Sequence, residues 1–284
     1  MAELLRKRIL LPVDGSNQSF EAVLYAAKAL FSQKTEFILF HVLGKVPDFL
    51  YDLEKEPQPN KEIPRSKVWE TTLKKAMQKF LGKVHLNLLD AGIPEEALEV
   101  KLRVRKTGIA RDILSESRRN RYDAVVVGRT GLSKFKGFLM GSIANKLIEK
   151  LAHIPLCVVG GKPETDKIVL ALDESEGAMR AVEFVAGLMD PSKFEVMLLH
   201  VVRDFNIYEK RYGNLFSLNF EEEWRETGKS EMESLFKVYR THLINSGFDP
   251  KRIITKIITR ESTRAGAIIH EAGAGGYGTI VMGR

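Results

Sequence analysis

Cysteine is nearly absent from this chain, because Cys157 is the only one in 284 residues. A single cysteine excludes a disulfide-stapled scaffold and a cysteine-rich zinc site. Long apolar runs are missing too: none reaches the roughly 18 residues that span a bilayer. The charged segment 1–8 is not followed by an apolar run of signal-peptide length. These absences predict a soluble, cytoplasmic protein without a membrane segment.

Several motifs that mark catalysis or nucleic-acid binding are also absent. The six histidines show no metal-ligand spacing, so we predict no metal site. Ser16 and Ser175 lie outside any Gly-x-Ser-x-Gly elbow, which argues against a serine hydrolase, and we predict no catalytic residue. The net charge of +7 favours an anionic partner. Nucleic acid is not the expected one, because no helix-turn-helix, zinc finger or RNA-binding signature accompanies the charge.

The second half of the chain repeats the first. Three segments recur in the same order: residues 8–14 as 167–173, residues 37–42 as 196–201, and residues 122–129 as 277–284. A repeat this long indicates two tandem domains rather than a solenoid of short units. We therefore predict a first domain over 1–160, a linker over 161–165 and a second domain over 166–284.

Apolar runs and helical periodicities alternate along the first repeat. Strands are predicted near 8–13, 36–43, 98–104, 123–127 and 156–160, and helices near 17–32, 65–91, 108–120 and 142–152. This alternation predicts the α/β class, with an open parallel sheet, helices on both faces and right-handed crossovers. Ligands of such sheets bind outside the carboxyl ends of the strands.

A glycine-rich loop, residues 128–142, follows a buried strand and precedes a helix. Ser142 stands where the N-cap of that helix is expected. The glycines would let backbone amides approach an anion, and the helix N-terminus and Arg129 add positive potential. We interpret the loop as a phosphate site. A glycine-rich turn without any ligand is the alternative.

The spacing of this loop, Gly-x2-Gly-x9-Gly-Ser, resembles the nucleotide-binding signature of the universal stress protein family. It is neither a Walker A loop nor a dinucleotide fingerprint. The resemblance covers residues 5–160 and most of 165–284. It implies a flavodoxin-like or Rossmann-like sheet of five parallel strands, order 3-2-1-4-5, in each domain. The second domain would lack its last helix and strand, and the two domains would pair as a pseudo-dimer, with homodimers possible.

The resemblance also implies ATP as ligand, with Mg²⁺ bound through its phosphates. The nucleotide-binding positions carried over are Pro12, Val13, Asp14, Val42, Gly128, Arg129, Gly131, Gly141, Ser142 and Ile143. Asp14 would contact the nucleoside, although an aspartate there also suits an Asx turn or an N-cap. No nucleotide is expected in the second domain, because its glycine loop stops after Gly283 and Glu174 replaces Gly15.

These features predict an ATP-binding regulatory protein of the stress response, in which occupancy of the first domain modulates conformation or partners. One alternative is a slow ATP hydrolase or nucleotide-transferring enzyme of the adenine-binding α/β superfamily. Another is a dimerisation scaffold without a ligand. The loop 128–142 contains no acid, and the chain has no His-x-Gly-His motif, so binding is favoured over turnover.

Overall fold

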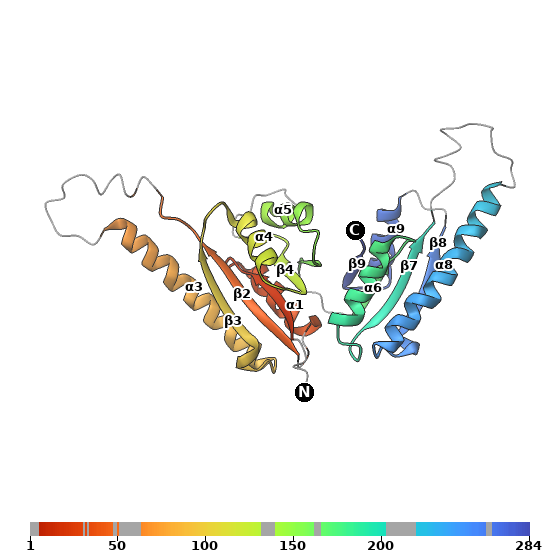
Figure 1. The fold of residues 1–284 in the computed structure, drawn as a ribbon, viewed down its shortest axis with the longest axis horizontal. Helices are drawn as coiled ribbons and strands as arrows, with labels where there is room; N and C mark the ends of the chain where they lie inside the picture. Colours follow the sequence, from red (N-terminus) through yellow and green to blue (C-terminus); the bar gives the residue numbers. More distant parts are fainter. Residues whose placement is uncertain are drawn as a thin grey trace. The chain divides into compact units, whose positions relative to one another are not determined.

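The chain folds into two compact units, Met1–Lys162 and Pro163–Arg284, referred to below as the first and second domains. The computed structural model describes residues 6–30, 32, 34–47, 50, 64–131, 140–161, 166–202, 220–259 and 263–284. Strands and helices alternate in both domains (Figure 1). Residues 162–165 of the predicted linker lie outside the described residues.

The first domain contains a parallel sheet of five strands in the order β3-β2-β1-β4-β5. Its strands are β1 (Lys7–Pro12), β2 (Thr35–Leu43), β3 (Leu98–Val104), β4 (Ala124–Gly128) and β5 (Leu156–Val159). Its helices are α1 (Asn17–Leu30), α3 (Arg65–Asp90), α4 (Ile109–Arg119), α5 (Ser142–Lys150) and the 3₁₀ turn η1 (Glu95–Ala97). The predicted class and strand order are confirmed.

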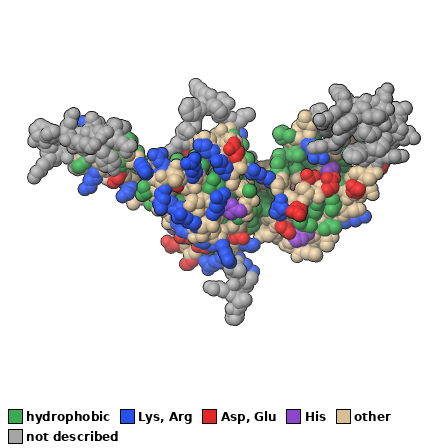
Figure 2. All heavy atoms as spheres, turned by 45° about the horizontal axis from the view of Figure 1, so that its top comes forward, with side chains coloured by type: hydrophobic (Ala, Val, Ile, Leu, Met, Phe, Trp, Pro, Cys, Tyr) green, Lys and Arg blue, Asp and Glu red, His purple; other side chains and the backbone are tan. Residues whose placement is uncertain are grey.

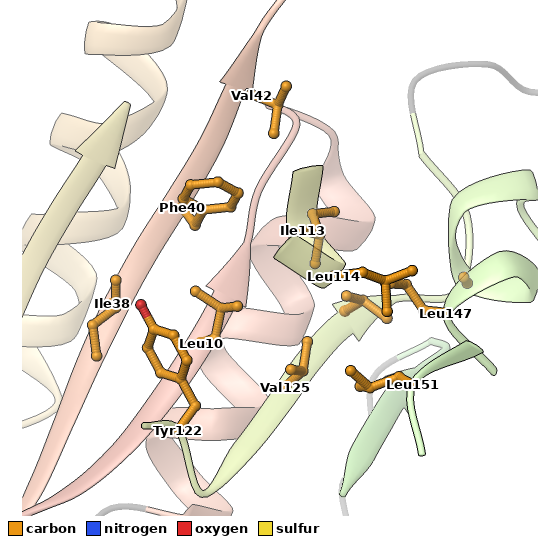
Figure 3. Packing of buried hydrophobic residues seen from close by; sticks show 12 residues of the cluster. Leu10, Ile38, Phe40, Val42, Ile113, Leu114, Tyr122, Val125, Leu147 and Leu151 are labelled. Carbon is orange, nitrogen blue, oxygen red and sulfur yellow. The ribbon is translucent and has the colours of Figure 1, made fainter. Parts of the chain in front are cut away.

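Successive residues of each strand point to opposite faces of this sheet. On one face Leu10, Ile38 and Val125 pack with residues of α4 and α5 in a buried cluster (Figure 3). Their neighbours in sequence, such as Ile9 and Phe37, are fully buried on the other face, where α1 packs against α3. Burial on both faces explains why these strands read as continuous apolar runs.

The second domain has a parallel sheet of four strands in the order β8-β7-β6-β9. Its strands are β6 (Lys167–Ala171), β7 (Glu195–Val201), β8 (Ile253–Ile258) and β9 (Thr279–Met282). Its helices are α6 (Glu176–Leu188), α8 (Phe220–Asn245), α9 (Arg264–Ala274) and the 3₁₀ turn η3 (Pro250–Arg252). This order corresponds to β3-β2-β1-β4 of the first sheet, so the described residues of the second domain form a sheet of four strands.

Equivalent serines, Ser16 and Ser175, immediately precede the first helix of each domain. The Ser19 N–H donates to Ser16 Oγ at 3.1 Å, and the Ala178 N–H donates to Ser175 Oγ at 3.3 Å. Each serine therefore satisfies a backbone donor in the first turn, as an N-cap does. The two domains share this local device as well as their topology.

A buried carboxylate, Glu116, ties α4 to β3 and to the start of β4. Its side chain is 1% exposed and forms an ion pair with Arg103. The Tyr122 hydroxyl donates to Glu116 Oε1 at 2.9 Å, and Asn120 Nδ2 donates to the same oxygen at 2.8 Å. Burial, followed by the bond to Glu116, raises the pKa of Tyr122. The charge is thus fully partnered, which is the condition for burying it.

Candidate functional site

A tight turn after β1 holds Asp14 at the carboxyl edge of the first sheet. The Ser16 N–H donates to Asp14 Oδ1 at 3.0 Å, which makes an Asx turn. Gly15, at the centre of the turn, has φ +86°, in the left-handed region that favours glycine. Because Ser16 caps α1, Asp14 has the Asx-turn role and not the N-cap role.

Asp14 meets the glycine loop at Gly131. A Cβ added at Gly131 would lie 2.5 Å from Asp14 Oδ2. The ends of β1 and β4, more than a hundred residues apart in sequence, are therefore in contact through a carboxylate and a bare backbone. Parallel strands bring their carboxyl ends to one sheet edge, and neighbouring order in the sheet makes this contact possible.

Gly128 serves helix packing. A Cβ at Gly128 would lie 2.8 Å from the carbonyl carbon and oxygen of Gln18 in α1. In the second domain, a Cβ at Gly283 would collide with the backbone of Gly177 in α6. The first glycine of the motif is thus required in both domains for the close approach of a helix, independently of any ligand.

Gly141 closes the loop and corrects one prediction. Its N–H donates to Arg129 O at 2.8 Å, and it is the N-cap of α5, with φ −71° and ψ 151°. Ser142, predicted as the cap, is instead the first helical residue, and no side chain of the described residues caps α5. Residues 132–139 lie outside the described part of the chain.

The apolar site residues lie in or beside the core. Val13 and Val42 are 5% and 7% exposed, and Ile143 packs against the cluster that contains Val42. Pro12 ends β1 and is partly exposed. Arg129 is exposed: its N–H donates to Val159 O at 2.7 Å, and its side chain lies against Gly160.

Sequence reasoning missed two neighbours of this edge. Gln18 Oε1 is buried without a hydrogen-bond partner among the described residues, on the turn of α1 that contacts Gly128. Thr130 lies against Gly141, where an added Cβ would be 3.2 Å from Thr130 Cα. No sequence signal distinguishes either residue from an ordinary helix or loop position.

Two buried histidines brace the turns that carry the acids. His41 Nδ1 lies 2.7 Å from Val13 O, and His200 Nδ1 lies 2.8 Å from Leu172 O. A carbonyl oxygen only accepts, so Nδ1 is the donor in both. His41 Nε2 is buried and has no hydrogen-bond partner in the described structure. Burial lowers the pKa of His41, against the opposing effects of the Val13 carbonyl and Asp14.

The lowered pKa of His41 predicts a loss of stability in acid. Between its folded pKa and the unfolded value near 6.5, the unfolded chain binds more protons, so the free energy of unfolding decreases as pH falls. The effect is at most about 1.4 kcal/mol per pH unit. Urea unfolding measures the free energy of unfolding at about pH 7.5 and at about pH 5.5. Its decrease between these two pH values should be smaller for His41→Asn than for the unaltered protein, and the Asn amide can still donate to Val13 O. Equal losses in the two proteins would contradict this account.

Among the described residues, no group of three or more His, Cys, Asp or Glu side chains is arranged to hold a metal ion. No helix in the described part of the chain is both long and apolar enough to cross a membrane.

Comparison with known proteins gives concordant matches. The model of the universal stress protein family matches residues 5–160 and again residues 164–284. Universal stress protein MJ0531 of Methanocaldococcus jannaschii is 27% identical over 159 residues, which are 55% of this chain and 84% of that protein.

A solved structure over most of the chain's length shows the same fold. A universal stress protein from Archaeoglobus fulgidus aligns with 96% of this chain and 85% of its own, at 19% identity and a TM-score of 0.59. Another universal stress protein, solved in complex with cAMP, covers 55% of this chain and 98% of its own, at 18% identity and a TM-score of 0.36. With two successive matches to the family model and the strand order described above, this chain belongs to the universal stress protein family.

Proposed function

We propose that the first domain binds ATP at the edge formed by the ends of β1 and β4, and that its occupancy modulates conformation or partners. The observation that carries this proposal is the contact of Asp14 with Gly131, where a side chain would collide with the carboxylate. This contact joins the acid after β1 to the glycine loop after β4. It supports a ligand that needs both a hydrogen-bond acceptor and exposed backbone amides.

The residues at this edge fit the parts of a nucleotide. The Asp14 carboxylate can accept hydrogen bonds from ribose hydroxyls or an exocyclic amine. The first amides of α5, which no described side chain caps, suit an anion, and the helix dipole favours negative charge there. Lys and Arg side chains gather on the face of the first domain that Figure 2 shows. Arg129 of this domain is exposed. Mg²⁺ would be held by the phosphates of the nucleotide and would neutralise part of their charge.

Regulatory binding fits these residues better than catalysis does. Phosphoryl transfer needs a positioned base and a carboxylate that holds the metal near the phosphates. The loop 128–142 contains no acid, and Asp14 is engaged in its Asx turn. A protein that binds a nucleotide without hydrolysing it can change the conformation of this loop, and thereby its partners, according to whether the site is occupied. The pairing of the two domains within the chain stays a prediction. The association of whole chains is a prediction that light scattering over a concentration series tests.

The ATP site predicts one nucleotide per chain. Calorimetric titration with Mg-ATP should give a stoichiometry near one, and a phosphate-release assay should show little turnover. Asp14→Asn should weaken binding about tenfold, as for loss of a hydrogen bond to a charged group. The equivalent change Asp173→Asn is the matched control and should leave ATP affinity unaltered. Two equal sites, or identical affinities in both variants, would refute the assignment to the first domain.

A further inference from the structure

A pocket opens in the second domain at the carboxyl ends of β6, β7 and β9. Its lining combines aliphatic side chains with three that bring charge or hydrogen-bonding capacity: Asp173, His200 and Arg264. The aliphatic lining includes Leu172, Leu199, Val201, Ile268 and Met282. Aliphatic side chains together with a few convergent polar groups are found in small-molecule sites.

Asp173 is prepared as a fixed acceptor. The Ser175 N–H and Ser175 Oγ–H donate to Asp173 Oδ1 at 3.1 and 2.5 Å. These bonds, with smaller contributions from Arg264 and His200, hold the pKa of Asp173 below its usual range. The carboxylate is therefore charged at neutral pH. Both bonds among the described residues use Oδ1, so Oδ2 is available to a donor from a ligand.

Arg264 supplies the opposite charge. It is the first residue of α9 and is exposed, and it acts on Asp173 through space without forming an ion pair with any described residue. Its guanidinium presents donors in the fork geometry that matches a carboxylate. The position also lies at the positive end of the helix dipole. An anionic group would meet two favourable fields at this wall.

His200 adds a second acceptor. Its Nδ1 donates to Leu172 O, so in the neutral ring Nε2 carries a lone pair. The imidazole is 4% exposed and lines the pocket. Asp173 and His200 therefore both favour donors on the ligand, whereas Arg264 favours an anion.

The first domain does not share this combination. The acid and the histidine have counterparts in Asp14 and His41, but the first residue of α4 is Ile109, where α9 has Arg264. At the end of β9, Met282 and Gly283 bound the pocket of the second domain. The two edges thus present different chemistry on one scaffold, and a second ligand class is the physical consequence.

We propose that this pocket binds a compact aliphatic organic acid that carries a hydroxyl or ammonium group. Its carboxylate is held by Arg264, its donor group by Asp173 and His200, and its aliphatic chain by Leu199 and Ile268. The site is separate from the ATP site and goes beyond the function proposed above. An α-amino acid and an α-hydroxy acid share this chemistry.

The test is a methyl-NMR titration of the full chain. L-Leucine and 2-hydroxy-4-methylpentanoate are the two probes, and 4-methylpentanoate and leucinamide lack the donor group and the carboxylate, respectively. We expect one or both probes to shift the methyl signals of Ile268 and Met282, and we expect each truncated analogue to bind about tenfold more weakly. The stronger probe identifies which donor group Asp173 prefers.

Variants separate the pocket from other binding. Arg264→Gln should weaken the better probe about tenfold, whereas Lys237→Gln, at an exposed position of α8, should not. Mg-ATP affinity should be the same in all three proteins, so failure of this site and failure of the ATP site are distinguishable. Absence of shifts up to roughly 50 mM probe, or equal binding to Arg264→Gln and the unaltered protein, would overturn the proposal.

Discussion

Glu116→Ala should destabilise the first domain by about 3–5 kcal/mol, the cost of breaking a buried charged pair from one side. The change leaves Arg103 without its partner and removes the acceptor of the Tyr122 hydroxyl. The change also removes a second ion pair of Glu116, in which Lys101 Nζ lies 3.7 Å from Glu116 Oε1. Urea unfolding, followed by a signal from each domain, measures the loss, and the second domain serves as an internal reference.

Glu99→Ala is the matched control for this change. Glu99 also forms two ion pairs, with Arg8 at 3.3 Å and Lys101 at 3.3 Å, but its side chain is 38% exposed. Exposed pairs contribute only about 0–1 kcal/mol, because water screens the charges in both states. If the two variants lost equal stability, the burial of Glu116 would not be what makes its charge important.

Gly131→Val should lower ATP affinity about 100-fold, or roughly 2.7 kcal/mol, while the domain stays folded. The Cβ alone would lie 2.5 Å from Asp14 Oδ2, so the carboxylate must move away from the turn that holds it. The same side chain would cover the backbone that a phosphate approaches. Calorimetry measures affinity, and circular dichroism checks the fold.

Gly82→Val provides the control for a glycine-to-valine change in the same domain. A Cβ at Gly82 meets no atom within 4 Å, and valine and glycine have similar, low helix propensities. Its ATP affinity should match that of the unaltered protein. Unchanged affinity in Gly131→Val would exclude the loop as the phosphate site. Gly141 is a poorer position for this test, since an added Cβ there presses on Arg129 O at 3.1 Å whether or not ligand is present.

Much of the fold could be predicted from the sequence because its determinants are local. The apolar runs of β1 and β2, and the recurrence of both in the second half, indicate two parallel sheets. Side-chain periodicity distinguishes strand from helix, and short connections between alternating elements leave few topologies. Asp14 and the glycines of the loop were also identifiable, since residue type and spacing carry their backbone preferences.

Tertiary structure decided which of these residues act together and why. Position 128 is glycine because the backbone of Gln18 lies against it. The N-cap of α5 is Gly141 and not Ser142, and the Gly141 N–H donates to Arg129 O. Neither fact follows from spacing, because the first depends on a helix that is distant in sequence and the second on a backbone contact across the loop.

The same holds for the pocket of the second domain, where the sequence predicted no site. Asp173, His200 and Arg264 belong to three separate segments, each unremarkable alone. Residue order determined the strands and helices of this protein, because those depend on neighbours along the chain. The sites depend on charges and close approaches across the sheet edge, and only the packed chain brings those together.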